Sequence, residues 1–442
     1  MRHVILGAGP SGVIAAETIR KHAPHDEVIV IGDEPEAPYS RMAIPYLLIG
    51  KVGEEGTHLR HGEGHYERLG ISLRRGRAKR VDVQARSVEL DDGSTLAFDR
   101  LLIATGSSPA SPPIPGIHGR GVHPCWTLKD ARAIAALARP GAKVIQMGAG
   151  FIGCIIMEAL QQRGVELTVV EMGDRMVPRM MGPTAGTMIR EWCEKKGVRV
   201  FTSTRVEAIE RRAPDLMDRL AEAGGIEDHV PATPMTVRLS SGEHLPADLV
   251  ISATGVRPNI GFLENSGITC LVGVLTDERL QTSVEGIYAA GDCAEAFDKV
   301  SGRTIVSAIQ PNAAEQARVA AMNMIGRDAT LKGVTQINVL DTLGMISASF
   351  GKWDGVPRGQ HVELTDRDEG RHLSLQFDGD ILVGCNSIGW TEHVGVMRGL
   401  VEGQVRLGDW KDRLLEDPTL LMEAYLACAQ AQGDFGWVRA KA

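Results

Sequence analysis

A glycine pattern that occurs twice constrains the fold of this chain more than any other feature. Each copy follows a short apolar run that predicts a β-strand, and each precedes a segment with helical spacing. In a strand–turn–helix unit, the first glycine allows a tight turn, the second lets the backbone approach a pyrophosphate, and the third lets the helix pack on the strand. The two copies are Gly7-Ala8-Gly9-Pro10-Ser11-Gly12 and Gly148-Ala149-Gly150-Phe151-Ile152-Gly153. The sequence therefore predicts two βαβ units, each with a dinucleotide at the N-terminus of its helix.

An acidic residue closes the strand that follows each glycine turn. Asp33 comes after the strand predicted at residues 27–31, and Glu171 comes after the strand predicted at residues 166–170. A carboxylate at this position accepts hydrogen bonds from the ribose hydroxyls of a dinucleotide. Glu171 would repel a 2′-phosphate, so we expect NAD in preference to NADP, although Arg175 is close enough to leave NADP open. Two alternatives remain open: the first glycine turn could serve packing alone, and Glu171 could only cap its strand.

Charge and cysteine content exclude several other classes of protein. The chain has 48 Lys and Arg against 56 Asp and Glu, a formal net charge of −8, which argues against nucleic acid or an anionic membrane as an obligatory partner. Its seven cysteines are too far apart for a zinc or iron–sulfur ligand set or for a redox dithiol. We therefore expect no metal site, and redox chemistry requires a bound cofactor. Without a leader or a long apolar stretch, we expect a cytoplasmic protein.

Three further features suggest how the chain is organised. A proline cluster between Pro109 and Pro115 indicates a crossover between domains. Residues 211–234 form a polar insertion, either a docking element or an exposed loop without consequence. From about Gly333 the pattern changes to strands at residues 337–339, 361–363, 373–377 and 381–385, followed by helices at residues 394–403 and 419–430. This last region predicts a separate α+β domain.

Five motifs, taken in order, resemble the FAD-dependent pyridine nucleotide-disulfide oxidoreductase family. Besides the two glycine turns they are Leu102-Ile103-Ala104-Thr105-Gly106, Ala253-Thr254-Gly255-Val256-Arg257-Pro258-Asn259 and Gly286-Ile287-Tyr288-Ala289-Ala290-Gly291-Asp292. The resemblance implies an α/β fold with two Rossmann-like, three-layer (ββα) dinucleotide-binding domains, the NAD domain inserted in the FAD domain, and a C-terminal α+β interface domain. The implied boundaries are 1–115 and 256–330 for the FAD domain, 116–255 for the NAD(H) domain and 331–442 for the interface domain.

The resemblance also implies which residues bind each cofactor. Asp292 would bind the ribityl chain of FAD, Thr105 and Gly106 would lie beside the flavin nucleotide, and Gly255 would line the path of the nicotinamide cofactor. Arg41 would contact the flavin or a phosphate, or else be a solvated loop arginine. The expected FAD residues are Gly7, Gly9, Pro10, Ser11, Gly12, Asp33, Arg41, Thr105, Gly106, Gly291 and Asp292. The expected NAD(H) residues are Gly148, Gly150, Phe151, Ile152, Gly153, Glu171 and Gly255.

The sequence lacks the reactive cysteine that several branches of this family use, which excludes thiol-based chemistry at the flavin. The loop that carries a reactive cysteine in the NADH oxidase and peroxidase branch reads Tyr39-Ser40-Arg41-Met42-Ala43-Ile44-Pro45-Tyr46 here, so Met42 takes the cysteine position. A thioether forms neither a thiolate nor a sulfenic acid. The chain is closer to the thiol-less branch, which resembles NADH-dependent ferredoxin and rubredoxin reductases and the flavin portion of nitrite reductase. That branch often has a lysine and a glutamate beside the flavin, where this chain has Tyr46 and Ile155.

These observations predict an oxidoreductase that moves hydride between NAD(H) and FAD, and electrons between FAD and an iron–sulfur protein or subunit. It would serve as the flavin subunit of a larger metalloenzyme complex such as an aldehyde oxidoreductase, and it would form a homodimer or a hetero-complex through the C-terminal domain. The alternatives are a flavin-only NADH oxidase and a non-catalytic redox regulator that binds FAD and NAD. Hydride transfer requires no general acid or base, so no catalytic residue is expected.

Overall fold

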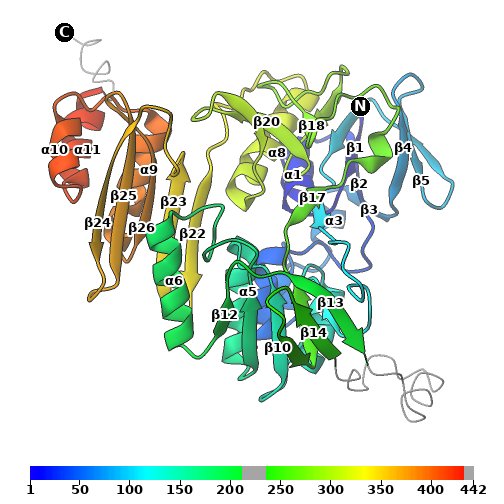
Figure 1. The fold of residues 1–442 in the computed structure, drawn as a ribbon. Helices are drawn as coiled ribbons and strands as arrows, with labels where there is room; N and C mark the ends of the chain where they lie inside the picture. The colour runs from blue at the N-terminus through cyan, green and yellow to red at the C-terminus, as the bar shows by residue number, and fades with distance from the viewer. Residues whose placement is uncertain (212–234, 433–442) are drawn as a thin grey trace, which may run out of the picture. The chain divides into compact units, whose positions relative to one another are not determined.

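The computed structural model describes residues 1–211 and 235–432, and contacts divide the chain into two compact units (Figure 1). The first unit comprises Met1–Ala110 and Val256–Thr335, and the second comprises Ser111–Gly255 and Gln336–Ala442. The predicted insertion at residues 211–234 lies outside the described residues except for Arg211. The second unit thus interrupts the first in sequence.

A five-stranded parallel sheet forms the centre of the first unit. Its strand order is β19-β7-β1-β2-β3, and the strands are β1 (Arg2–Leu6), β2 (Glu27–Gly32), β3 (Ile71–Arg75), β7 (Arg100–Ile103) and β19 (Ile287–Ala289). Because β1 is central and α1 (Pro10–His22) follows it directly, the first glycine turn lies at the carboxyl edge of the sheet. In open α/β sheets this edge binds ligands.

Two different layers cover the faces of this sheet. On one face, Ile5, Val28 and Val30 pack with α1 and with α8 (Gln310–Met324). On the other face, Val4 and Leu6 pack with an antiparallel sheet of β4 (Ala78–Asp82), β5 (Ser87–Leu90) and β6 (Thr95–Ala97). Alternate residues of one strand therefore serve two cores, as expected for a parallel strand buried on both faces. The predicted three-layer ββα arrangement is confirmed.

Two short paired strands carry the chain out of and back into the first unit. In β8 (Ser107–Pro109) and β17 (Val256–Pro258) the pairing is antiparallel, with Ser108 opposite Arg257. A third small sheet joins β18 (Val274–Leu275), β20 (Ala294–Asp298) and β21 (Arg303–Val306), and β21 leads into α8.

The second unit repeats the same plan. Its parallel sheet has the order β12-β11-β10-β16-β9, with β9 (Val122–His123), β10 (Lys143–Met147), β11 (Glu166–Val170), β12 (Arg199–Phe201) and β16 (Leu249–Ser252). The helices are α4 (Leu128–Leu137), α5 (Phe151–Gln162) and α6 (Pro183–Lys195). The antiparallel layer consists of β13 (Val206–Arg211), β14 (Met235–Leu239) and β15 (His244–Ala247), and its Met235 and Val237 pack against Ile145 and Val170.

The C-terminal part of the second unit is an antiparallel sheet with helices on one face. The sheet order is β22-β23-β26-β25-β24, with β22 (Ile337–Thr342), β23 (Met345–Gly351), β24 (Gln360–Asp366), β25 (Arg371–Asp378) and β26 (Ile381–Ile388). Three helices follow, α9 (Val394–Gly403), α10 (Trp410–Glu416) and α11 (Leu421–Gln432). On β26, Asn386 donates to the carbonyl of Met180 and accepts from the amide of Gly182, both at 2.8 Å. These bonds join the sheet to the segment before α6.

The structure adds elements that the sequence analysis did not predict. Strand β23 and helix α10 were not predicted, and the loop at residues 39–46 contains a 3₁₀ turn (Arg41–Ala43) and the start of α2 (Ile44–Leu48). Pro45 lies in the first turn of α2, where its missing N–H costs nothing. The α/β fold class is confirmed, whereas the boundaries of the implied domains remain a prediction.

Candidate dinucleotide-binding sites

The first glycine turn is shaped by close backbone packing at two of its three glycines. Gly7 has φ +116°, and a Cβ there would lie 2.0 Å from the carbonyl oxygen of Ala104. A Cβ on Gly12 would lie 1.9 Å from the carbonyl oxygen of Gly7. Gly9 differs, because its backbone is extended (φ −78°, ψ −174°) and no described atom lies within 4 Å of a Cβ built on it. The open space at Gly9, beside the N-terminus of α1, fits the approach of a pyrophosphate.

The second glycine turn has the same division of roles. Gly148 has φ +95°, with a Cβ position 2.4 Å from the carbonyl oxygen of Ala253, and a Cβ on Gly153 would lie 2.6 Å from the carbonyl oxygen of Gly148. Gly150 is extended (φ −75°, ψ −171°) and has open space around its Cβ position. Phe151 and Ile152 begin α5 and are half-buried. A second dinucleotide therefore fits at the N-terminus of α5.

The two strand-end acids have different surroundings. Asp33 is half-exposed, and it accepts a hydrogen bond of 3.0 Å from Nε of Arg77. Glu171 accepts from the backbone amide of Ala149 through one carboxylate oxygen and from that of Gly173 through the other, each at 2.7 Å. Glu171 is thus held against its own glycine turn, at the position where a ribose would approach.

Arg175 does not face a 2′-phosphate position with free donors. Its Nε donates to the carbonyl of Met181 at 2.9 Å, and its two terminal nitrogens bond to Asp174 and to the carbonyl of Pro178. The side chain is 18% exposed. Its guanidinium is therefore hydrogen-bonded within its own loop, which argues against a role in binding a 2′-phosphate.

Asp292 is half-buried in a hydrogen-bonded turn that follows β19. Gly291 before it has φ +83°, and the Oδ2 of Asp292 accepts from the hydroxyl of Ser107 at 2.9 Å. Burial raises the pKa of the Asp292 carboxyl, while the hydrogen bond from Ser107 and the positive charge of Arg41 act in the opposite direction. The three motifs that hold Gly106, Gly291 and Arg41 are thus brought together in the first unit.

Arg41 takes part in a local hydrogen-bonded network, and its side chain is 37% exposed. One terminal nitrogen donates to Oε1 of Glu34 at 2.7 Å, and the other donates to the hydroxyl of Tyr39 at 3.1 Å. Tyr39 in turn donates to Oε2 of Glu34 at 2.6 Å. Nearby, Met42 and Tyr46 are 50% and 54% exposed.

Asn259 links the segments that contain β8 and β17. It ends the motif that begins at Ala253, and no role was predicted for it. Its Nδ2 donates to the carbonyl of Thr105, and the Oγ1 of Thr105 donates to the carbonyl of Asn259, at 2.9 and 2.8 Å. Gly106 (φ +63°) and, in the second unit, Gly255 (φ +112°) have open space at their Cβ positions. These contacts fix the backbone on which Ser107 is placed.

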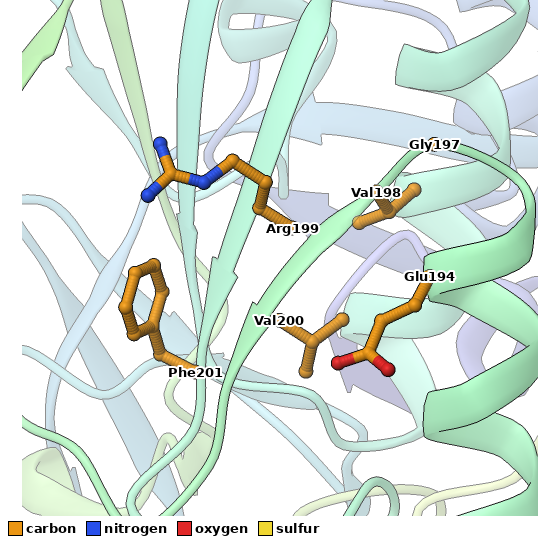
Figure 2. Close-up of a pocket in the computed structure, with 6 residues that line it drawn as sticks. All are labelled: Glu194, Gly197, Val198, Arg199, Val200 and Phe201. Carbon is orange, nitrogen blue, oxygen red and sulfur yellow. The ribbon is translucent and has the colours of Figure 1, made fainter.

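An open groove elsewhere in the second unit is separate from the glycine turn. Figure 2 shows it between the C-terminal end of α6 and the edge strand β12, lined by Glu194, Gly197, Val198, Arg199, Val200 and Phe201, with a volume of about 450 Å³. The guanidinium of Arg199 lies 5.3 Å from the ring centre of Phe201. None of these residues was predicted to bind a cofactor.

Comparison with known proteins decides the family. Residues 1–322 match the family described as pyridine nucleotide-disulphide oxidoreductase. The chain belongs to this family. It is accordingly an FAD-dependent NAD(P)H oxidoreductase that uses FAD and NAD(H), and the geometry of its two glycine turns fits these two dinucleotides.

Individual family members support the fold and the class. The chain is 30% identical to the NADH-dependent phenylglyoxylate dehydrogenase subunit epsilon of Aromatoleum evansii over 422 residues, covering 94% of this chain and 95% of that subunit. It is 29% identical to the ferredoxin reductase component of chlorobenzene dioxygenase from a Cupriavidus strain, covering 73% and 74%. The structure of an NAD-dependent persulfide reductase from A. fulgidus superposes with a TM-score of 0.82 at 26% identity, covering 92% of this chain and 78% of that chain.

The seven cysteines of the chain are all free and mostly buried. Six of the seven are buried, Cys270 is half-buried, and none forms a disulfide. Burial raises the pKa of all seven thiols, to about 12 for Cys125 and Cys193. A thiol with a raised pKa is a poor nucleophile because the thiolate is the reactive form. In the part of the chain that the structure describes, no three His, Cys, Asp or Glu side chains are grouped to bind a metal, and no helix is long and apolar enough to cross a bilayer.

Thiol alkylation is therefore expected to leave the flavin chemistry of this family member intact. Treatment of the native protein with N-ethylmaleimide should label Cys270 alone, and the rate of flavin reduction by NADH should change less than about twofold. Mass spectrometry gives the number of labelled cysteines under native and denaturing conditions, and all seven should be labelled in the denatured control. A loss of NADH-driven reduction in proportion to labelling would contradict the thiol-independent mechanism.

Proposed function

We propose that the first unit holds FAD, the second unit holds NAD(H), and the protein is the flavin subunit of a larger complex that exchanges electrons with an iron–sulfur subunit. The observation that carries this proposal is the combination of two open dinucleotide turns, at Gly9 and Gly150, with thiols that are all buried or half-buried. A relative that is itself a subunit, and that this chain covers almost completely, supports a place in a complex.

Several of the predicted cofactor residues have a specific task in this proposal. The amides at the N-termini of α1 and α5 face the two pyrophosphates, since helix N-termini attract anions. Asp33 and Glu171 accept from the ribose hydroxyls, with Arg77 orienting Asp33. Asp292 binds the ribityl chain, and the positive charge of Arg41 favours the ionised form of the Asp292 carboxyl. Gly7, Gly12, Gly148 and Gly153 shape the two glycine turns.

The protein residues in this mechanism bind and orient, and none moves a proton. Bound FAD supplies the redox chemistry, because a flavin takes two electrons as hydride from nicotinamide and releases electrons singly to metal centres. Met42 contributes no thiol. Each NADH would supply two electrons for two one-electron transfers to iron–sulfur centres, and the proton of the hydride would pass to solvent. A ferredoxin reductase component among the relatives is consistent with an acceptor of this class.

The proposal is tested by separating the two half-reactions. The native protein is purified under mild conditions, its co-purifying subunits are identified, and stopped-flow absorbance follows flavin reduction by NADH and reoxidation. We expect fast reduction, fast reoxidation by the iron–sulfur partner and slow reoxidation in air. Oxygen consumption as fast as flavin reduction would indicate a flavin-only NADH oxidase, and a bound flavin that NADH does not reduce would indicate a non-catalytic regulator.

A further inference from the structure

Two side chains from distant elements hold the turn that carries Asp292. The amide of Gly291 donates to Oε1 of Gln316 at 2.7 Å, and the hydroxyl of Ser107 donates to Oδ2 of Asp292 at 2.9 Å. Gln316 lies on α8 and Ser107 lies on β8, so one contact fixes the main chain before Asp292 and the other fixes its carboxylate.

The main-chain contact is tightly enclosed. Gly291 has φ +83°, and a Cβ there would lie 2.4 Å from Oγ of Ser11 on α1. Ser11 itself donates to the carbonyl of Ala313 on α8 at 3.3 Å. The turn therefore lies between the start of α1 and α8, and a residue with a side chain at position 291 would have to displace the hydroxyl of Ser11.

Gln316 is an unusual side chain for such a buried position. It is 0% exposed, and its Nε2 has no partner among the described residues. An unsatisfied buried donor destabilises the folded protein, and an apolar side chain of similar shape would avoid that cost. The bond from the Gly291 amide is the compensating contact, because without it that amide would also be buried and unsatisfied.

Ser107 has a similar role for the carboxylate. It is 5% exposed, and it belongs to the strand that Thr105 and Asn259 cross-link to β17. A hydroxyl donor stabilises the ionised form of a buried carboxyl, which offsets part of the rise in the pKa of Asp292 that burial causes.

We infer that Ser107 and Gln316 are positioning residues that orient Asp292 for FAD. This inference rests on the proposed function, in which Asp292 binds the ribityl chain. Gln316 sets the direction of the peptide that leads into Asp292, and Ser107 sets the rotamer and favours the charged state of the carboxylate. Both act through Asp292 rather than by contact with the cofactor.

The test measures the Kd of FAD for the apoprotein by fluorescence quenching, together with the thermal midpoint of the apoprotein. Ser107→Ala and Gln316→Met are each expected to weaken FAD binding by about tenfold, the value of one lost hydrogen bond of about 1.4 kcal/mol. The decisive measurement is a double-mutant cycle, because Ser107→Ala should weaken FAD binding much less in an Asp292→Asn background than in the wild type.

Matched controls come from the second unit. Gln146 is also 0% exposed, with Nε2 bonded to the carbonyl of Gly148 and Oε1 without a partner among the described residues. Ser252 is a buried serine whose hydroxyl likewise has none. Gln146→Met and Ser252→Ala should leave the Kd of FAD unchanged.

The outcomes separate the inference from the proposed function. A wild-type apoprotein that does not bind FAD contradicts the proposed function. Wild-type binding with an unchanged Kd in Ser107→Ala and Gln316→Met, or an effect of Ser107→Ala that is equally large without Asp292, contradicts the positioning role. Should Gln316→Met fail to fold, the Ser107→Ala cycle decides on its own.

Discussion

Gly150→Ala is expected to raise the KM for NADH by about 100-fold while the protein stays folded and retains FAD. The backbone of Gly150 is extended (φ −75°), so alanine adopts it without strain, and no described atom lies within 4 Å of the new Cβ. The methyl group instead takes the space in which the pyrophosphate must approach the backbone. A 100-fold effect corresponds to about 2.7 kcal/mol.

Gly9→Ala provides the mirror image in the first unit. Its backbone is also extended and its Cβ position is also open, so the expected result is loss of FAD without loss of folding. The two variants together assign each dinucleotide to one turn. Flavin absorbance after purification and a titration with NADH are the two measurements.

Controls for this pair distinguish the binding effect from a general effect of the methyl group. Gly395→Ala, on α9, adds a methyl group into open space without a positive φ, and it should change neither binding constant. Gly7→Ala should fail to fold, since its Cβ would lie 2.0 Å from a backbone oxygen at φ +116°. Loss of FAD in Gly150→Ala, or normal NADH binding in that variant, would contradict the assignment.

NADH is expected to be the better substrate over NADPH by about 100-fold in kcat/KM. The carboxylate of Glu171 lies beside the glycine turn, bonded to the amides of Ala149 and Gly173, where it would repel a 2′-phosphate. The guanidinium of Arg175, which would attract that phosphate, is bonded to its own loop. Steady-state kinetics with NADH and with NADPH give the two values of kcat/KM whose ratio tests this expectation.

Glu171→Gln should lower this preference to less than about tenfold by improving the use of NADPH, because the amide removes the repelling charge at nearly constant volume. The same variant should weaken NADH binding moderately, since one of the two backbone amides loses its acceptor. Glu166→Gln, at the exposed start of the same strand, is the matched control and should leave the ratio unchanged. Equal use of both cofactors by the wild type would show that Glu171 only caps its strand.

Local spacing explains why the two glycine turns were predictable. Most of the close contacts of the turn glycines are with residues at most seven positions away, so local sequence order largely specifies the geometry; the exceptions are the backbone at Ala104-Thr105 and at Ala253-Thr254. The three-layer plan followed from the resemblance and is confirmed by the packing of alternate residues such as Val4 and Ile5 into separate cores.

The contacts that sequence reasoning missed join distant parts of the chain. The bond from Ser107 to Asp292 spans 185 positions, and no local pattern distinguishes Ser107 from Ser108 beside it. Gln316 lies in an alanine-rich helix where a polar residue normally predicts an exposed face, but tertiary contact buries it. The bonds of Arg175 to the carbonyl groups of Met181 and Pro178 are local, but they depend on a loop conformation that no sequence pattern indicates.

The pairing of β8 with β17 has a consequence for how the chain assembles. Strands β7 and β19 are neighbours in one sheet, with Leu101 opposite Ile287, although the segment that forms the whole second glycine unit intervenes. Closing so long an excursion costs entropy that grows only logarithmically with its length. Pro109 and Val256 are register partners, so the two ends of the inserted residues 111–255 are held side by side. If these residues fold first, they would connect the two strands of the first unit as a short hairpin loop does. A shortened flavoprotein in which a tight turn replaces residues 111–255 is therefore a feasible engineering target. It would keep the parallel sheet of the first unit.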